Sequence, residues 1–332
     1  MRISLIICTF KRAMPLLNLL GSIKNQSQLP DEILIIDGSP DDRTKQALTN
    51  ISLAQLHYHK VKPDQRGLTR QRNIGIDLCR KDMDIVTFLD DDIVLDKDYF
   101  KNLISSYDKY PNAIAVGGYI VNDTKWELEN NFKSKINLFC YDGYCRPEGQ
   151  RFKLRKRLNL EPNRPPAHLP KFSHGRSVGF LPPSGKTYQV EQFMGGVSSY
   201  RKEVFEELSF SSYFEGYGLY EDADFCFRLL QYGKLYVNTA AHCEHHHHPS
   251  GRPNQFKYGQ MVVRNGWYVW RLRWPNPGAK NILKWHTNVL LLTFLRFLNT
   301  FTSLNRKQAL TEGLGRLTAW LELWFLKPKI QR

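Results

Sequence analysis

Residues 85–92 read Ile-Val-Thr-Phe-Leu-Asp-Asp-Asp, so three carboxylates directly follow a run of apolar and β-branched residues. Such a run is typical of a buried strand, from which the acids emerge at the carboxyl edge of a sheet. A bound divalent cation relieves the repulsion among clustered carboxylates, and Mg²⁺ and Mn²⁺ prefer carboxylate oxygens together with substrate phosphates. The stretch therefore predicts a metal site on a parallel sheet. The alternative is an acidic loop that caps the next helix.

The same alternation fills the first 120 residues. Further short apolar runs predict strands at Ile3–Cys8, Ile33–Asp37 and Ala113–Ile120, and helical patterns between them lie at Met14–Asn25, Gly67–Arg80 and Lys97–Tyr107. This order predicts an α/β fold with a mostly parallel sheet flanked by helices. Because open α/β sheets bind ligands at the carboxyl ends of their strands, we expect the polar residues after each strand to gather there.

Three polar segments suit a nucleotide. Thr9-Phe10-Lys11-Arg12 offers a hydroxyl, an aromatic face and two cations near a helix start, and Asp37 precedes a Gly-Ser turn where it can accept hydrogen bonds from a base or ribose. Residues 65–75 place three arginines at a helix start, where cations are unfavourable unless an anion such as a diphosphate is near. A capping turn at Asp37 and ordinary surface arginines are the alternatives.

Later motifs add candidate chemistry. We expect a strand over Phe193–Tyr200 and a helix from Glu221 to Gly233. Glu221 and Asp222 then sit at the positive end of the helix dipole and should stay ionised, and an ionised carboxylate can deprotonate a hydroxyl. The tract 242–248 supplies five imidazoles, one of which could complete a metal site begun by the aspartates. The alternatives are helix capping for the two acids and an exposed tract for most of the histidines.

In this order the motifs resemble the inverting family 2 glycosyltransferases of GT-A fold, close to the rhamnosyl- and related cell-surface polysaccharide transferases. The resemblance covers roughly residues 3–255 and rests on the strand-plus-Thr, Ile-Asp-Gly-Ser, Arg-Asn-Ile-Gly, Asp-Asp-Asp and Glu-Asp-Ala-Asp segments. It implies a hexosyltransferase that moves one sugar from a nucleoside-diphosphate sugar to an acceptor hydroxyl. Processive members carry Gln-x-x-Arg-Trp, whereas this chain has only Gln260-Met-Val-Val-Arg264, so the addition of single sugars is favoured.

The resemblance also implies site residues. Asp222 matches the general base, and Glu221 supports it. A divalent cofactor, Mn²⁺ or Mg²⁺, would be held by Asp92 with Asp90 and one histidine of the 242–248 tract, for which we prefer His245. The remaining candidates for nucleotide-sugar binding are Thr9, Phe10, Arg12, Asp37, Gly67, Arg70, Asn73, Asp90, Asp91, Gly195 and Gly196.

Charge is concentrated at the end of the chain. The net charge is +15, and residues 264–332 hold 12 lysines and arginines against two glutamates together with six of the seven tryptophans. We therefore expect a catalytic domain over 1–260, with an acceptor-side insertion at 122–188, and a basic helical tail over 261–332 that contacts an anionic membrane. A lipid-linked oligosaccharide acceptor would suit such a tail. The alternative is helices packed on the catalytic domain or at a dimer interface.

Other features of the sequence indicate the cellular location of the protein and argue against other functional classes. The apolar run at the N-terminus is too short for a signal peptide, and the six cysteines lack the spacing of a zinc site or disulfide framework. A cytoplasmic protein, peripheral on the inner face of the cytoplasmic membrane, fits best. A nucleic-acid-binding protein would not need Asp90–Asp92, which repel phosphates, and a nucleotidyltransferase would show a Gly-rich phosphate loop. A non-catalytic sugar-nucleotide-binding module remains the alternative, against which Asp222 argues.

Overall fold

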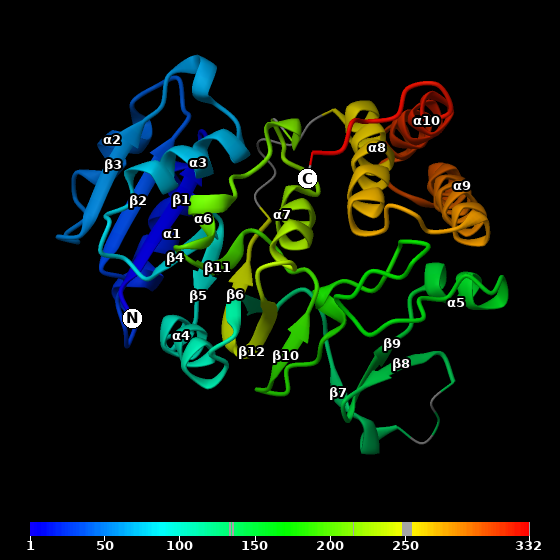
Figure 1. The fold of residues 1–332 in the computed structure, drawn as a ribbon, viewed down its shortest axis with the longest axis horizontal. Helices are drawn as coiled ribbons and strands as arrows, with labels where there is room; N and C mark the ends of the chain where they lie inside the picture. The colour runs from blue at the N-terminus through cyan, green and yellow to red at the C-terminus, as the bar shows by residue number, and fades with distance from the viewer. Residues whose placement is uncertain (133, 135, 215, 248–253, 332) are drawn as a thin grey trace. The chain divides into compact units, whose positions relative to one another are not determined.

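The computed structural model describes residues 1–132, 134, 136–214, 216–247 and 254–331. The chain divides into two compact units. The first, here the sheet unit, comprises Met1–Lys125 and Leu181–Gly251, and the second, here the helical unit, comprises Trp126–Phe180 and Arg252–Arg332. Figure 1 shows the elements of each.

Half of the main sheet is parallel. Its strands lie in the order β3-β2-β1-β4, with bounds β1 Ile3–Thr9, β2 Glu32–Asp37, β3 Leu56–Lys60 and β4 Ile85–Asp90. The connecting helices are α1 Ala13–Lys24, α2 Arg43–Leu48 and α3 Leu68–Leu78, with a 3₁₀ turn at Pro63–Gln65. The predicted strands are confirmed because their apolar runs are buried on both faces, as parallel sheets require. The edge strand β3 alternates partly buried and exposed positions and lacks such a run.

The other half of the sheet is mixed. β11 Val197–Arg201 lies antiparallel between β4 and β6 Ala113–Ile120, and β12 Lys234–His245 pairs parallel with β6 and antiparallel with β10 Thr187–Val190 and β5 Ile93–Leu95. Helix α4 Tyr99–Lys109 packs on β6 and β12. Two short elements, α6 Val204–Glu207 and a 3₁₀ turn at Ser212–Phe214, precede α7 Glu221–Leu229. The predicted α/β class with a mostly parallel sheet is confirmed.

Two predicted boundaries in this half are wrong. The strand expected from Phe193 begins at Val197, because residues 194–196 turn toward the side chains of Asp90 and Glu221. The helix expected to end at Gly233 ends at Leu229, and β12 begins at Lys234, directly after that glycine.

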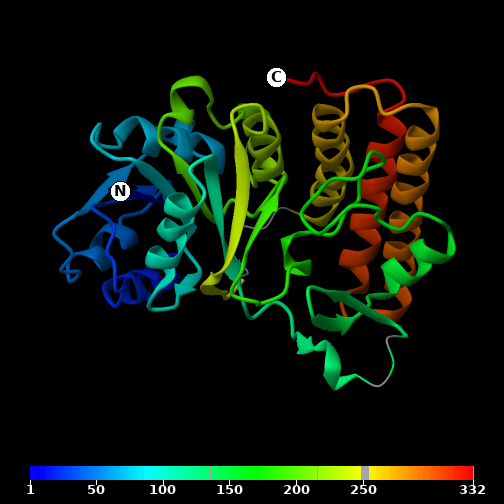
Figure 2. The same ribbon diagram turned by 60° about the horizontal axis from the view of Figure 1, so that its bottom comes forward.

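The helical unit combines a small sheet with three long helices. Strands β7 Glu127–Leu128, β8 Leu138–Tyr141 and β9 Tyr144–Pro147 form the sheet, followed by α5 Gln150–Arg157, with 3₁₀ turns at Glu129–Asn131 and Val178–Phe180. Helices α8 Gln255–Arg273 and α9 Ala279–Thr302 both pack against α10 Arg306–Glu322 (Figure 2). No described helix is long and apolar enough to cross a membrane.

Glycines allow α8 and α10 to approach closely. A Cβ at Gly259 would lie 2.2 Å from the Glu312 carbonyl oxygen, and one at Gly315 would lie 2.1 Å from the Phe256 carbonyl oxygen. Because no real Cβ tolerates such distances, the backbone contact depends on both glycines. The sequence pattern of apolar residues alone does not reveal this contact.

One cysteine pair departs from expectation. Cys140 and Cys145 form a disulfide between β8 and β9, where they are cross-strand partners. The cysteine spacing, which indicated no disulfide framework, therefore did not reveal this pair. Asp142 and Gly143 join the strands with positive φ angles of 49° and 80°, the conformation of a tight hairpin turn that sets the register. The cysteines Cys8, Cys79, Cys226 and Cys243 are free thiols.

Candidate active site

Parallel pairing brings three predicted residues to one edge of the sheet. Thr9 on β1 pairs in register with Asp37 on β2, and Cys8 pairs with Asp90 on β4. The ends of these strands therefore lie side by side, as the sequence predicted.

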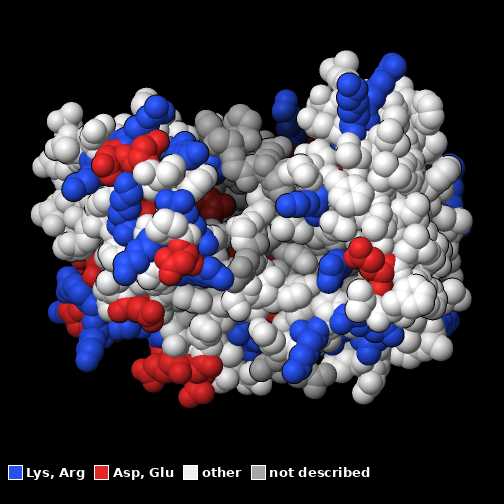
Figure 3. Space-filling model, turned by 90° about the horizontal axis from the view of Figure 1, so that it is seen from above, with Lys and Arg blue, Asp and Glu red and all other residues white. Residues whose placement is uncertain are grey.

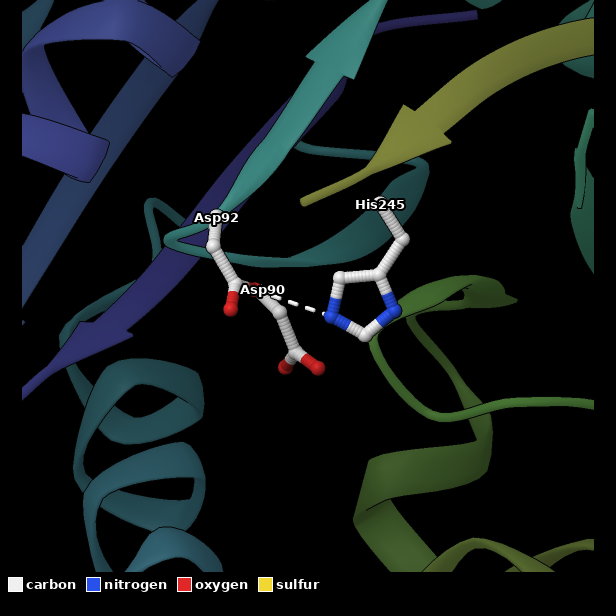
Figure 4. Close-up of side chains that lie close together, drawn as sticks. All are labelled: Asp90, Asp92 and His245. Atoms are coloured by element: carbon white, nitrogen blue, oxygen red, sulfur yellow. Dashed lines mark ion pairs between the residues drawn. The ribbon is translucent and has the colours of Figure 1, made fainter. Parts of the chain in front are cut away.

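The end of β12 brings a histidine to two of the aspartates and completes a candidate metal site. Ligand atoms of Asp90, Asp92 and His245 all lie within 4.8 Å of one another. His245 is the last residue of β12, and its Nε2 lies 3.0 Å from Asp92 Oδ1. Figure 4 shows the His245 imidazole facing the side chains of Asp90, the last residue of β4, and Asp92, which precedes β5. Two carboxylates and an imidazole form a donor set that suits a divalent cation.

Backbone contacts fix His245 opposite the aspartates. The Asn122 side chain holds the backbone of His245 at both ends: Nδ2 donates to the His245 carbonyl and Oδ1 accepts from the His245 N–H, each at 3.0 Å. The N–H of His246 donates to the Asp92 carbonyl at 3.0 Å. Of the remaining histidines in the tract, His242 lies 3.3 Å from Asp96, His247 lies 3.0 Å from Asp123, and His248 lies outside the described residues.

The middle aspartate has partners within the protein. Asp91 is only 4% exposed; it accepts from Thr9 Oγ1 at 2.7 Å and pairs with Arg12 Nη1 at 3.0 Å. The same Arg12 nitrogen lies 3.3 Å from Asp92. Burial raises the pKa of Asp91 to about 6, although the Thr9 hydrogen bond and the Arg12 charge oppose that shift. These contacts favour a structural role for Asp91 and Arg12, which shape the loop that carries Asp90 and Asp92.

Asp37 is fully buried at the end of β2. It accepts from the Ser39 N–H at 2.8 Å and from the Tyr58 hydroxyl at 2.9 Å. Burial, together with this hydrogen bond, raises the pKa of Tyr58. Phe10, which follows β1, is 41% exposed and offers an open aromatic face.

One of the three arginines that were expected beside a diphosphate instead pairs with acids and links both halves of the site. Arg72 on α3 is 2% exposed; its Nη1 lies 2.6 Å from Glu221 Oε1 and its Nη2 lies 3.8 Å from Asp90 Oδ1. Its guanidinium packs on the rings of Phe88 and Phe210. Thr69 and Gly75, small residues three positions before and after Arg72, share its helix face, and that face is buried in the structure.

The two acids at the start of α7 differ in their partners. Glu221 is 6% exposed and pairs with Arg72, while its Oε2 has no hydrogen-bond partner among the described residues. Asp222 accepts from the Ala223 N–H at 2.7 Å and from the Gly195 N–H at 3.4 Å. Burial raises the pKa of both groups, that of Glu221 to about 8. Burial therefore opposes the ionisation that the helix dipole was expected to favour, and it does so most strongly at Glu221.

Gly195 and Gly196 lie between the metal candidates and α7. A Cβ at Gly196 would lie 2.2 Å from Asp90 Oδ2, and one at Gly195 would lie 2.7 Å from Glu221 Oε1. The Asp90 N–H also donates to the Gly196 carbonyl at 2.9 Å. Only glycine fits at these positions, so this short segment brings Asp90, Glu221 and Asp222 together.

Three other predicted residues are engaged elsewhere in the sheet unit. Gly67 precedes α3 with a φ of 123°, a conformation that L side chains rarely adopt. Arg70 donates to the Asp64 carbonyl at 2.5 Å, and the Asn73 amide exchanges two hydrogen bonds of 2.9 Å with the backbone of Phe210. These contacts favour a structural role for Asn73, which holds the backbone of Phe210, the residue whose ring packs on Arg72.

Comparison with known proteins identifies the family. The model for "Glycosyl transferase family 2" matches residues 4–208. A glucosyl-dolichyl phosphate glucuronosyltransferase of Haloferax volcanii is 29% identical over 128 residues, which cover 37% of this chain and 39% of that protein. An O-antigen chain rhamnosyltransferase of Salmonella typhimurium is 32% identical over 119 residues, 36% of this chain and 37% of that protein. The match thus spans about two fifths of each curated relative.

Solved structures agree on the fold. A mannosyltransferase of Pyrobaculum calidifontis, solved with GDP-Man and Mn²⁺, superposes with a TM-score of 0.53 at 14% identity over 97% of this chain and 86% of that chain. GalNAc-T7, solved with UDP, GalNAc and Mn²⁺, gives a TM-score of 0.53 at 15% identity over 80% of this chain and 48% of that chain. These likenesses support the predicted GT-A fold. Because the family model covers more than half of its residues, the chain belongs to glycosyl transferase family 2.

Proposed function

We propose that the chain transfers a single sugar from a nucleoside-diphosphate sugar to an acceptor hydroxyl with inversion at the anomeric carbon. The observation that carries this proposal is the junction at Gly195 and Gly196. One side of it contacts Asp90, a member of the Asp90–Asp92–His245 group, and the other side contacts Asp222. A candidate metal site and a candidate base therefore flank one short segment.

Each residue then has a chemical task. Asp90, Asp92 and His245 would hold a divalent cation, either Mn²⁺ or Mg²⁺, which stabilises negative charge on a diphosphate when it is bound. Asp222 accepts the proton of the acceptor hydroxyl as the hydroxyl oxygen attacks the anomeric carbon. The bond from that carbon to the diphosphate breaks, and its electron pair leaves with the diphosphate. Attack opposite the leaving group in a single displacement inverts the carbon.

Other residues form the donor side. Asp37, Thr9 and Phe10 stand at adjoining strand ends, where the exposed Phe10 ring can contact a base and Asp37 can accept from a base or ribose. Arg72 holds Glu221 in place beside Asp222 and is the buried cation of the site. We keep Arg12, Gly67, Arg70, Asn73 and Asp91 as residues that shape this donor site.

We further propose that the acceptor is a glycan or a lipid-linked oligosaccharide of the cell envelope. The names of the curated relatives, which concern a glucosyl-dolichyl phosphate and an O-antigen chain, support this class. The proposal retains residues 1–260 as the catalytic part, 122–188 as the acceptor-side insertion and 261–332 as the tail.

A specific observation favours membrane contact by the tail. Exposed apolar side chains recur at helical spacing on α9, at Leu283, Leu290, Phe294, Leu298 and Phe301. Exposed cations stand at or next to the ends of α9 in the sequence, at Lys280, Arg306 and Lys307, and further along the chain at Lys327 and Lys329. Lys and Arg in Figure 3 are scattered over a mostly uncharged surface where α8 to α10 lie. Such a surface suits an anionic bilayer on the cytoplasmic face, where donor nucleotides are available.

Vesicle binding tests this second proposal. We expect sedimentation with phosphatidylglycerol vesicles, weakened by the double change Phe294→Ser and Phe301→Ser. The matched control Leu29→Ser alters an exposed leucine of the sheet unit and should have no effect. Equal binding by all three proteins would reject the membrane proposal.

The donor proposal is tested by calorimetric titration with UDP, GDP and dTDP, each with Mn²⁺ and with a chelator. We expect one nucleotide to bind in a metal-dependent manner, and Asp92→Ala to abolish this binding. If no nucleotide binds with metal present, the donor site is rejected. A non-catalytic sugar-nucleotide-binding module would bind the donor but never transfer its sugar, and a nucleic-acid-binding protein would instead bind nucleic acid with a steep salt dependence.

A further inference from the structure

The helical unit contains buried polar atoms that lack partners. Arg155 on α5 is 2% exposed and Trp285 on α9 is 1% exposed. Arg155 Nη2, Trp285 Nε1 and the buried His174 Nδ1 have no hydrogen-bond partner among the described residues. An unsatisfied buried donor costs roughly 1–3 kcal/mol, and a charged one costs more. These three nitrogens, from a guanidinium, an indole and an imidazole, therefore point to a ligand that supplies acceptors.

The three residues lie together. The rings of His174 and Trp285 are 6.4 Å apart between centroids. Arg155 Nε donates to the Leu160 carbonyl at 3.1 Å, and Lys284, which precedes Trp285, donates to the adjoining Asn159 carbonyl, so Arg155 and Trp285 flank the same short segment. Burial, followed by the Arg155 charge, lowers the pKa of His174 to about 3. A neutral imidazole can donate through Nδ1.

Neighbouring contacts make the arrangement rigid. Trp285 stacks on Trp270 at 5.1 Å, and Trp270 Nε1 donates to the Lys171 carbonyl at 2.8 Å. This hydrogen bond anchors the segment that carries His174 to α8. Lys284, next to Trp285, donates to the Asn159 carbonyl beyond the end of α5 at 2.9 Å. The positions of Arg155, His174 and Trp285 are therefore set by contacts that do not use Arg155 Nη2, His174 Nδ1 or Trp285 Nε1.

Positive charge is in excess around these residues. Arg155 has no ion-pair partner among the described residues; its Nε donates to the Leu160 carbonyl. The nearby acids Glu148 and Glu161 both pair with Arg176, at 2.9 Å and 3.4 Å. A single glutamate, Glu312, serves both Arg296 and Arg316. An anion would neutralise the charge that these acids leave unmatched.

We propose that Arg155, His174 and Trp285 bind a phosphate or diphosphate group, and that this group is the one linking the glycan acceptor to its lipid carrier. A guanidinium fork matches two phosphate oxygens, and the indole and imidazole N–H groups supply further donors. The identity of the ligand rests on the proposed function, because only a transferase with a phosphate-linked acceptor needs such a group. The site itself rests on the geometry of the helical unit.

Binding of inorganic pyrophosphate to the full chain tests the site. A chelator is included so that a metal-loaded donor site does not compete. We expect pyrophosphate to bind and to raise the melting temperature of the wild-type protein, and Arg155→Met to weaken binding by roughly tenfold or more. The matched control Arg157→Met changes an exposed arginine of the same helix and should bind like the wild type. Equal affinity in all three proteins, or no binding by the wild type, would overturn the site.

A second variant covers the case in which Arg155→Met does not fold. Trp285→Phe removes the Nε1–H while keeping a ring to stack on Trp270, and we expect a several-fold loss of pyrophosphate affinity. Unchanged affinity in Trp285→Phe would remove this residue from the site.

Three ligands distinguish the source of the phosphate. We expect Arg155→Met to lose binding to a prenyl diphosphate in detergent while its sedimentation with phosphatidylglycerol vesicles is unchanged. Loss of vesicle binding alone would assign the site to membrane headgroups, and loss of pyrophosphate binding alone would assign it to free phosphate; both results reject the acceptor assignment. Metal-dependent nucleotide binding, measured on the same variants, reports the donor site separately, so failure of the proposed function is recognised independently.

Discussion

Arg72 Nη1 lies 2.6 Å from Glu221 Oε1, and both side chains are almost fully buried in the sheet unit. This contact joins α3 to the start of α7, where Asp222 follows. Removing one partner of a buried ion pair strongly destabilises a protein. The pair therefore contributes to holding the start of α7, and with it the candidate base, in place.

Removing the Arg72 guanidinium should therefore destabilise the fold. We expect Arg72→Met to lower the free energy of unfolding by about 3–5 kcal/mol, because Glu221 would be left buried and unpaired. Urea denaturation measures the change. The control Arg43→Met, at an arginine whose side chain is 85% exposed, should change it by less than about 0.5 kcal/mol. An equal effect of the two changes would contradict the structural role of the pair.

Gly196 should tolerate no side chain. The added Cβ of Gly196→Ala would lie 2.2 Å from Asp90 Oδ2, so Asp90 must move and we expect metal-dependent nucleotide binding to fall at least roughly tenfold. The control Gly21→Ala lies within α1 with no atom near its Cβ and should stabilise the protein by about 0.5–1 kcal/mol. Undiminished nucleotide binding in Gly196→Ala would show that the position of Asp90 is unimportant.

Asn122 should support metal affinity without ligating the metal. It clamps the backbone of His245 by two hydrogen bonds, and loss of a supporting contact of this kind typically weakens metal binding about 10–100-fold. Calorimetric titration of Asn122→Ala with Mn²⁺ measures this loss, with the exposed Asn50→Ala as control. If Asn122→Ala binds Mn²⁺ like the control, His245 does not depend on this clamp.

The rate should depend on pH through the base. Burial raises the pKa of Asp222 above the ordinary aspartate value of 3.8, and only the deprotonated form accepts a proton. We therefore expect kcat to rise with pH and level off, with a midpoint above 3.8. The profile is measured at saturating substrates. If the midpoint disappears in Glu221→Gln, the titration belongs to Glu221 and the assignment to Asp222 is wrong.

Stability should depend on pH through His174. Its pKa is lowered by burial and by the Arg155 charge to about 3, below the ordinary value of 6.5, so the unfolded chain binds a proton more readily than the folded one. The contribution of neutral His174 to the free energy of unfolding is complete above pH 6.5 and is lost as the pH falls toward 3. Between pH 7 and 5 the wild type should lose up to about 2 kcal/mol more than His174→Gln. Parallel pH dependences in urea denaturation would contradict this.

Much of the fold follows from the sequence because parallel strands bury both faces. The runs that form β1, β2, β4 and β6 are nearly all apolar and were predicted within one or two residues. β3 lies at the sheet edge, and polar residues alternate with apolar ones along it, so its sequence contains no continuous apolar run that predicts a strand. The strands at 127–147 are short and partly exposed, which hides them in the same way.

The candidate site divides along similar lines. Asp90 and Asp92 were predicted because carboxylates clustered after an apolar strand repel one another unless a cation binds them. The family resemblance pointed to one histidine of the 242–248 tract. The ion pair of Arg72 with Glu221 was not predicted, since it joins residues 149 positions apart and depends on how α3 and α7 pack. The raised pKa of Glu221 has the same origin, because burial is a property of the packed structure.

The transfer reaction of Asp222→Asn tests the central claim most directly. With the donor identified by nucleotide binding, release of nucleoside diphosphate is measured in the presence of acceptor and Mn²⁺. The proposed function predicts donor affinity within about twofold of the wild type and a kcat lower by roughly 10²–10⁴-fold, the usual contribution of a general base. Transfer at the wild-type rate by Asp222→Asn, or donor binding without any transfer by the wild type, would contradict it.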